Sequence, residues 1–240
     1  GDVGEGKLAD VGEIVATALA LLAPRDLAGL RVLVNAGPTH EAIDPVRYIA
    51  NRSTGKMGYA IAEAAARRGA EVTLVSGPTS LPTPAGVRRV DVESAAQMHD
   101  AMLAEFAAAD AAICSAAVAD YAPAAPADHK LKKSREHLDA IALTETADIL
   151  ADLCAAKGER TVVGFAAETD DLLAHAREKL AHKGADLIVA NDVSRPESTF
   201  GADTNRVALV SADGVEQLET MPLADVANAI LDPVLRMVTR

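Results

Sequence analysis

The chain has 240 residues, of which 50% are apolar, and this is typical of one globular α/β-sized domain rather than a disordered chain. Its formal net charge of -12 argues against a general nucleic-acid binder, and no apolar run reaches the roughly 18 to 20 residues of a membrane span. Cys114 and Cys154 lack a CxxC or histidine partner spacing, so we expect buried, reduced thiols, as in a cytoplasmic protein.

Residues 1–29 indicate a linker and a lead-in helix. They begin glycine-rich and acidic, continue through the apolar stretch Val11–Leu22, and reach Pro24, which cannot continue a helix. Because the first residue is Gly1 rather than Met, we expect the chain to be a processed or truncated piece of a longer protein. The domain itself is expected over residues 30–240.

Short apolar runs then alternate with helical patterns, which predicts a mainly parallel sheet. The expected strands are Arg31–Ala36, Glu71–Ser76, Val87–Val92, Asp110–Val118, Thr161–Ala166 and Asp186–Ala190. The expected helices are Lys56–Arg68, one capped by Ser94, Thr146–Ala156, Asp170–His182 and Ala224–Val238. The predicted fold is therefore a Rossmann-like α/β sheet with helices on both faces.

Two segments interrupt the alternation. The first, Ala119–Leu138, is long, polar and rich in Lys and Arg, which predicts a functional flap. The second, Gly201–Glu219, holds two β-type runs on either side of Ala212-Asp213-Gly214, a hairpin signal.

The stretch Asn51–Tyr59 joins a polar loop to an alanine-rich helix. Glycines, hydroxyls and a lysine crowd the expected N-terminus of this helix, where unpaired backbone N–H groups and the helix dipole attract anions. A simpler interpretation is that Ser53 or Thr54 caps the helix, but capping requires neither Gly58 nor Lys56. The stretch therefore predicts a seat for a phosphate or a carboxylate.

Two common phosphate-binding motifs are absent. A dinucleotide fingerprint needs G-x-G-x-x-G directly after the first strand and an acid ending the second, whereas Gly55 and Gly58 follow a long excursion and the second strand ends at Ser76. A Walker A loop is missing because Met57 follows the Gly-Lys pair. An NAD(P)-dependent oxidoreductase is disfavoured, and a nucleotide-binding module without catalysis stays open.

Other candidate residues lie near the predicted strand ends, where open parallel sheets bind ligands. Asp120 could hold the Mg²⁺ of a nucleotide triphosphate, or be a solvated loop residue or cap. Phe165 could stack on a base, although core packing is commoner. Lys130 could reach phosphates as a point charge, although a charge run is more often a solvated face. Lys179 and Lys183 share one helical face.

Five motifs in this order resemble phosphopantothenoylcysteine synthetase, in the bacterial CTP-dependent form that is the C-terminal half of a bifunctional coenzyme A biosynthesis protein. The motifs are Asn51–Gly58, Ala116–Tyr121, Lys130–Lys133, Gly164–Thr169 and Ala190–Val193. The resemblance implies a ligase that condenses 4′-phosphopantothenate with L-cysteine. CTP would activate the carboxylate as an acyl-cytidylate with release of pyrophosphate, and the cysteine amine would then displace CMP.

The resemblance also implies roles for individual residues. It makes Asn51 and Lys130 catalytic, and it puts Asp120 at the ribose or at Mg²⁺. The expected phosphate and substrate loop comprises Asn51, Ser53, Gly55, Lys56 and Met57. The expected CTP site comprises Ser115, Ala116, Ala117, Asp120, Lys130, Phe165, Ala166, Ala167, Glu168, Lys179 and Lys183. Ala122 stands where relatives often carry a basic residue, which weakens the case for a phosphate contact there.

The implied partners follow from the same resemblance. We expect a homodimer formed through strands outside the main sheet, for which the Gly201–Glu219 hairpin is the candidate. Residues 1–29 would join this domain to an N-terminal decarboxylase half that is absent here and that would hold FMN, so no flavin site is assigned to this chain. Neither a nucleic acid nor a membrane is expected as a partner.

Overall fold

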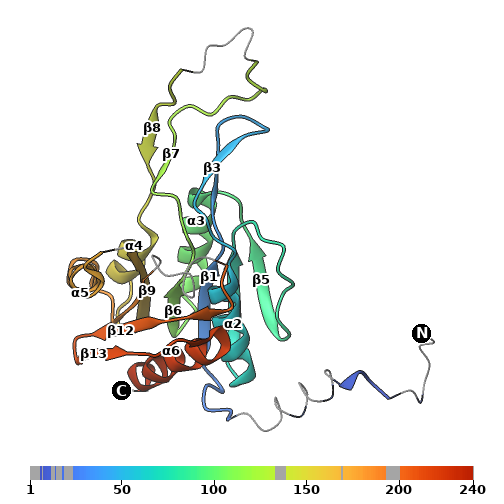
Figure 1. Ribbon diagram of the computed structural model, residues 1–240, viewed down its shortest axis with the longest axis vertical. Coiled ribbons are helices and arrows are strands. Elements are labelled where there is room, and N and C mark those ends of the chain that lie inside the picture. The colour runs from blue at the N-terminus through green and yellow to red at the C-terminus, as the bar shows by residue number, and fades with distance from the viewer. Residues whose placement is uncertain are drawn as a thin grey trace.

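An eight-stranded sheet forms the centre of the structure, a computed structural model (Figure 1). The model describes residues 6, 8–11, 14, 18, 24–132, 139–168, 170–192 and 201–239. Most of the expected lead-in helix over Val11–Leu22 lies outside these residues, as do Lys133, Arg135, Thr169 and Val193.

Six strands of the sheet are parallel and doubly wound. They are β1 (Arg31–Ala36), β4 (Glu71–Ser76), β5 (Val87–Asp91), β6 (Ala111–Cys114), β9 (Thr161–Glu168) and β10 (Leu187–Asp192). Their order is β5-β4-β1-β6-β9-β10, so the direction of winding reverses between β1 and β6. This order confirms the predicted Rossmann-like sheet. Strand β6 ends four residues earlier than expected, at Cys114, because the chain bends there toward the loop after β1.

The predicted hairpin extends this sheet at one edge. It consists of β12 (Val207–Ser211) and β13 (Gly214–Gln217), and β12 runs antiparallel to β10. The expectation that this hairpin lies outside the main sheet is therefore wrong. The physical reason is that Val207–Val210 are all buried, so β12 needs cover on both faces and takes a place in the core. The homodimer itself stays a prediction.

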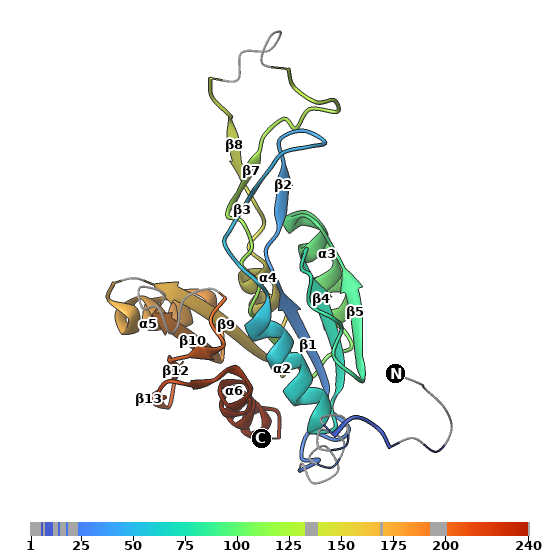
Figure 2. The same ribbon diagram turned by 45° about the vertical axis from the view of Figure 1, so that its right-hand side comes forward.

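Helices cover both faces of the sheet (Figure 2). One face packs against α2 (Lys56–Arg67) and α6 (Leu223–Val238), which also contact each other. The other face packs against α3 (Ala95–Phe106), α4 (Ile149–Ala155) and α5 (Leu172–Lys183). This arrangement leaves the carboxyl ends of the parallel strands open for a site.

The helix starts show how local sequence sets these elements. The Ser94 hydroxyl caps α3 in a full capping box with Gln97, as predicted for this helix start. Helix α4 begins later than expected, with Asp148 as its N-cap, because the Thr146 hydroxyl donates to the Ala119 carbonyl instead. Helix α5 begins at Leu172.

Two hairpins project from the carboxyl end of the sheet and lie side by side (Figures 1 and 2). The first consists of β2 (His40–Ala42) and β3 (Tyr48–Ala50), and the second of β7 (Tyr121–Pro123) and β8 (Leu143–Glu145). We call residues 40–50, 121–132 and 139–145 the arm. The sequence indicated a polar excursion and a flap here but not these four strands. A further pair, β11 (Thr204–Asn205) and β14 (Met221–Pro222), lies before α6.

The first turn of α2 packs very closely on the end of β1. A Cβ atom added to Gly58 would lie 2.5 Å from Ala36 Cβ and 3.0 Å from the Asn35 carbonyl oxygen. One at Gly55 would lie 3.3 Å from the Gly37 backbone. These glycines therefore let the N-terminus of α2 sit against the backbone of the strand that it follows.

Gly58→Ala tests this packing, because helix propensity and sterics predict opposite signs. Propensity alone would raise the free energy of unfolding by about 0.8 to 1.0 kcal/mol. Overlap with Ala36 is expected to cost more, so we expect a net loss of about 1 to 2 kcal/mol in urea unfolding. A net gain in stability would contradict the close approach.

Candidate functional site

A cavity of about 760 Å³ opens at the carboxyl end of the sheet, where the strand order reverses. Four neighbouring strand ends contribute to its wall: Asn35 from β1, Cys114 from β6, Phe165 from β9 and Asn191 from β10. This is the place at which doubly wound sheets bind their ligands.

Two buried polar side chains shape the wall formed by residues 115–120. Asn35 Oδ1 accepts a hydrogen bond from the Ala116 N–H at 2.8 Å, and Thr39 Oγ1 accepts one from the Ala119 N–H at 3.0 Å. Both side chains are buried, so these bonds are protected from water. The sequence did contain a signal for Asn35 that we missed, namely a polar residue directly after the apolar run Val32–Val34.

The N-terminus of α2 opens into the cavity without a side-chain cap. Its N-cap is Gly55, with φ of 79°, and no side chain in the described part of the chain caps the first turn. Ser53 Oγ accepts from the Gly55 N–H, at 3.3 Å, and not from a residue of the helix itself. The capping interpretation is therefore wrong. The backbone N–H groups of Lys56, Met57 and Gly58 make no hydrogen bond within the described residues, and all three residues line the cavity, as an anion seat requires.

The Asn51 side chain joins this loop to the opposite wall. Its Nδ2 donates to the Val118 carbonyl oxygen at 2.9 Å. The bond spans 67 positions of sequence, and it fixes the direction of an otherwise exposed amide at the cavity. Asn51 thus lies where the seat and the wall meet.

Three lysines on the cavity wall each donate to an acceptor elsewhere in the protein. Lys179 Nζ donates to the Phe165 carbonyl oxygen at 2.8 Å, and Lys183 pairs with the Asp148 carboxylate. Partial burial raises the pKa of Asp148, but the hydrogen bond from Lys183 and the charges of both lysines lower it overall. Lys56 Nζ donates to the Gly201 carbonyl oxygen and to Asp203 Oδ1.

Both cysteines are free, as predicted, and Cys154 is buried as expected, whereas Cys114 is half-buried. Burial raises the pKa of Cys114, on the cavity wall, to about 12, and that of Cys154 to about 11. The reactive form of a cysteine is the thiolate, so neither side chain is suited to act as a nucleophile near neutral pH.

The cavity gathers most of the predicted site residues. Those that line it are Asn51, Ser53, Gly55, Lys56, Met57, Ser115, Ala116, Ala117, Asp120, Phe165, Ala167, Lys179 and Lys183. Ala166 does not line it, because successive residues of β9 face opposite sides and its side chain packs in the core with α3, α4 and α5. Glu168 ends β9, and its side chain lies outside the described residues.

Sequence reasoning missed the cavity wall between the arm and α4. Glu145, Thr146, Asp148 and Ile149 all line the cavity. The available signal was an aspartate just before an apolar helical run, which is typical of a helix N-terminus.

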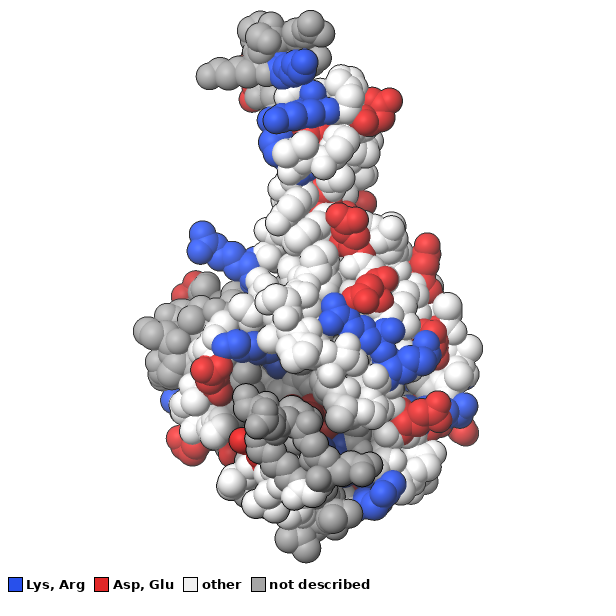
Figure 3. Space-filling model, turned by 90° about the vertical axis from the view of Figure 1, so that its right-hand side faces the viewer, with Lys and Arg blue, Asp and Glu red and all other residues white. Residues whose placement is uncertain are grey.

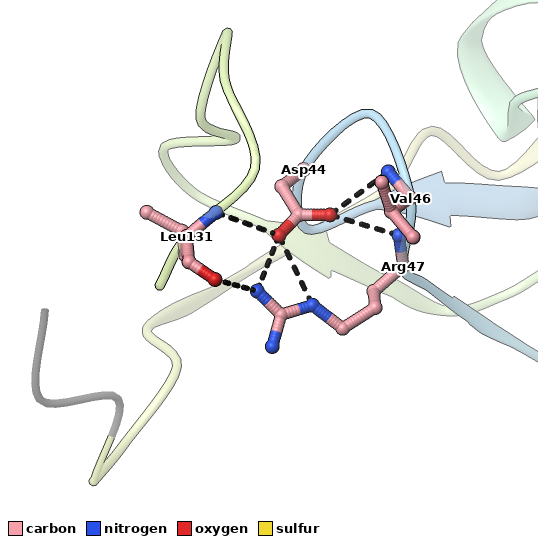
Figure 4. A network of polar contacts seen from close by, with 4 residues as sticks. All are labelled: Asp44, Val46, Arg47 and Leu131. Carbon is pink, nitrogen blue, oxygen red and sulfur yellow. Dashed lines mark hydrogen bonds and ion pairs between the residues drawn. The ribbon is translucent and has the colours of Figure 1, made fainter. Parts of the chain in front are cut away.

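Lys130 lies on the arm, exposed and away from the cavity wall. Its neighbour Leu131 is tied to the first hairpin (Figure 4). Asp44 accepts from the Leu131 N–H at 3.1 Å, and Arg47 Nη2 donates to the Leu131 carbonyl oxygen at 3.0 Å. The described basic residues of the arm are Arg47, Lys130 and Lys132, and Figure 3 shows basic side chains gathered there.

Asp44 is the centre of this network and only 3% exposed. It also accepts from the Val46 and Arg47 backbone N–H groups, both at 2.9 Å, and pairs with the Arg47 guanidinium. The Arg47 hydrogen bonds hold the pKa of Asp44 well below its ordinary range, against the opposing effect of burial. The ionised carboxylate is therefore what joins the two hairpins.

Within the described residues, no three His, Cys, Asp or Glu side chains converge to hold a metal ion. Asp120 is an exposed carboxylate at the cavity, as are Glu145 and Asp148. Mg²⁺ commonly binds through one or two carboxylates together with substrate phosphates, and Asp120 fits that use. No helix among these residues is long and apolar enough to cross a membrane.

Comparison with known proteins shows what the chain is similar to. The family model of the DNA/pantothenate metabolism flavoprotein C-terminal domain matches residues 27–237. The coenzyme A biosynthesis bifunctional protein CoaBC of Vibrio cholerae is 46% identical over 233 residues, which are 96% of this chain. The protein of the same name from Bacillus subtilis is 47% identical over 98% of this chain.

The chain spans 58% of the length of the Vibrio cholerae protein and 59% of the Bacillus subtilis protein. Among solved structures, the C-terminal domain of a coenzyme A biosynthesis bifunctional protein CoaBC superimposes with a TM-score of 0.77 and 42% identity. The match covers 90% of this chain and 98% of that domain.

Asp44→Asn tests whether the carboxylate joins the two hairpins. The Ala127 N–H donates to the Ile43 carbonyl oxygen at 3.0 Å, so it reports on the contact between the hairpins. Losing the charge and one acceptor oxygen of Asp44 should free the second hairpin, so amide hydrogen exchange at Ala127 and Leu131 should rise several-fold at neutral pH. The matched control is Asp128→Asn, which removes an exposed charge from the same arm and should leave both amides unchanged. Equal exchange in the two variants would contradict the role of Asp44.

Proposed function

The chain belongs to the family of the DNA/pantothenate metabolism flavoprotein C-terminal domain, and we propose that it is a ligase condensing 4′-phosphopantothenate with L-cysteine in coenzyme A biosynthesis. CTP activates the pantothenate carboxylate as an acyl-cytidylate and pyrophosphate leaves. The cysteine amine then attacks the acyl carbon, CMP leaves, and an amide bond forms. The names of the similar proteins support this pathway.

One observation carries the proposal most directly. The uncapped N-terminus of α2 points its free N–H groups into the large cavity at the switch point of the sheet. A ligand with phosphate groups at one end and a larger body suits such a site, because the helix terminus binds the anion while the strand ends hold the remainder.

The reaction must bring a carboxylate against a triphosphate, and positive groups must offset that repulsion. We assign this task to the seat around Lys56 and to Lys179 and Lys183 on α5. Asn51 orients the reacting groups through its amide, which the Val118 carbonyl holds in place. Phe165 offers a ring for the base.

Mg²⁺ would neutralise phosphate charge when it is bound, and Asp120 would be its protein ligand. Three carboxylates contribute to the cavity lining, those of Asp120, Glu145 and Asp148. A nucleotide that binds together with its own cation carries less negative charge, so the carboxylates of the cavity repel its phosphates less.

The role of Lys130 requires a further step. The network of Asp44 and Arg47 holds its neighbour Leu131 on the arm. For Lys130 to reach a reacting phosphate, the arm must bend, or a second copy must present its own arm to this cavity. The second route agrees with a homodimer, which we keep as part of the proposal.

The remaining expectations concern the whole protein. We propose that this domain works in the cytoplasm, joined to a decarboxylase half that would hold FMN. The similar proteins are called bifunctional and are longer than this chain, which supports a second domain.

Nucleotide-dependent turnover tests the proposal. The protein is mixed with 4′-phosphopantothenate, Mg²⁺ and one nucleotide at a time, with and without L-cysteine. Among the nucleotides, we expect CTP and no other to give a single-turnover burst of pyrophosphate in the absence of L-cysteine. We expect CMP to appear only when L-cysteine is added. If no nucleotide yields pyrophosphate, the chain is a binding module rather than this ligase.

Asn51→Asp probes the link between the seat and the wall. The change replaces an amide donor with a carboxylate oxygen that faces the Val118 carbonyl, and it places a negative charge near the phosphates. We expect pyrophosphate release to fall by about tenfold or more, the equivalent of about 1.4 kcal/mol.

The matched control is Asn228→Asp on α6, where the side chain makes a similar bond to the Ala224 carbonyl at 2.9 Å. It lies outside the cavity lining and should leave turnover unchanged. Equal rates for the two variants would remove Asn51 from the mechanism.

A further inference from the structure

The Lys56 ammonium already has an anionic partner inside the protein. Lys56 Nζ donates to Asp203 Oδ1 at 2.7 Å and to the Gly201 carbonyl oxygen at 2.8 Å. These acceptors lie more than 140 positions away in sequence, so the contacts are purely tertiary. The ammonium group of the lysine that sequence analysis placed in the anion seat is therefore already paired with a carboxylate of the same chain.

Residues 201–205, which we call the strap, lie across the anion seat. Gly201, Ala202, Thr204 and Asn205 all line the cavity. An added Cβ at Gly201 would lie 3.4 Å from Thr54 Cγ2, so the strap rests directly on the loop before α2. Gly201 also has φ of 95°, which a residue with a side chain rarely adopts.

The strap is also held by backbone contacts that do not involve Lys56. Its residues Thr204 and Asn205 form β11, which pairs with β14. The Asp203 carbonyl oxygen accepts from the Leu223 N–H, at the start of α6, at 3.1 Å. The backbone beside the carboxylate is therefore anchored independently of the ion pair with Lys56.

The contact with Lys56 is exchangeable. The side chain of Asp203 is 89% exposed and that of Lys56 is 34% exposed. Ion pairs with such exposure are weak and screened by salt. A phosphate or diphosphate group carries more charge than one carboxylate and can also accept from the free N–H groups of the first turn of α2, so it should displace Asp203 from the ammonium.

We propose that Asp203 is a positioning residue that holds Lys56 at the strap and competes with the anionic ligand for its ammonium. Asp203 thereby sets the affinity of the seat for a phosphate or diphosphate group, and binding transfers Lys56 from the strap to the ligand. This deepens the proposed function, because it rests on the seat holding the phosphates of that reaction.

Inorganic pyrophosphate is the probe, and isothermal titration calorimetry measures its dissociation constant without any turnover. Asp203→Asn should tighten pyrophosphate binding about three- to fivefold at low salt, which is the upper range for an exposed ion pair. The gain should shrink toward unity at high salt, because screening weakens the competing pair. The gain in pyrophosphate affinity should also vanish in the Lys56→Gln background, because no ammonium group is left for which Asp203 and pyrophosphate could compete.

Asp213→Asn is the matched control, since it removes the same charge from the turn between β12 and β13, outside the cavity. If Asp203→Asn and this control bind pyrophosphate equally, or if Asp203→Asn binds it more weakly, Asp203 is only a structural contact and the proposal is wrong. A gain that persists without Lys56 would overturn it too, as would a failure of every variant to bind pyrophosphate. Binding without CTP-dependent turnover would instead contradict the proposed function alone.

Discussion

The close approach of α2 to the end of β1 is the constraint on which the site depends. A Cβ at Gly58 would overlap Ala36, and one at Gly55 would fit only tightly against Gly37, so the helix starts directly beside the strand backbone. Its first-turn N–H groups are consequently presented at the switch point, where the sheet leaves a crevice. The buried side chain of Asn35 then fixes the opposite wall from the same strand end. One contact between strand and helix thus positions both sides of the cavity.

Electrostatics explains how an acidic chain can hold a polyanion. The formal net charge is -12, yet four cations and three carboxylates line the cavity among the described residues. Each of the three lysines already has a partner in the protein, because Lys56, Lys179 and Lys183 each donate to an acceptor of the chain. These bonds hold the ammonium groups in place, and in the proposed reaction the ligand phosphates exchange with some of them. Preorganised positive groups of this kind are what a reaction between two anions requires.

Elements with a strong local signal were predictable from the sequence. Arg31–Ala36 and Glu71–Ser76 match the observed strands residue for residue, because continuous apolar runs bounded by glycine leave little choice. The start of α2 at Lys56 could also be predicted, since helix-start chemistry is local, whereas the binding of an anion there stays a prediction. The place of β12 and the position of Lys130 could not. Each depends on partners distant in sequence. The hairpin depends on β10, and the arm depends on Asp44, which lies 87 positions before the Leu131 amide that it binds.

The central claim is that the switch-point cavity binds a nucleotide with its phosphates on the N-terminus of α2. A crystal structure of the protein with Mg²⁺ and a non-hydrolysable CTP analogue tests this directly. The account predicts density for the phosphates within hydrogen-bond distance of the backbone N–H groups of Lys56–Gly58, with the base toward Phe165. Phosphates bound elsewhere, with that helix terminus facing only water, would contradict it.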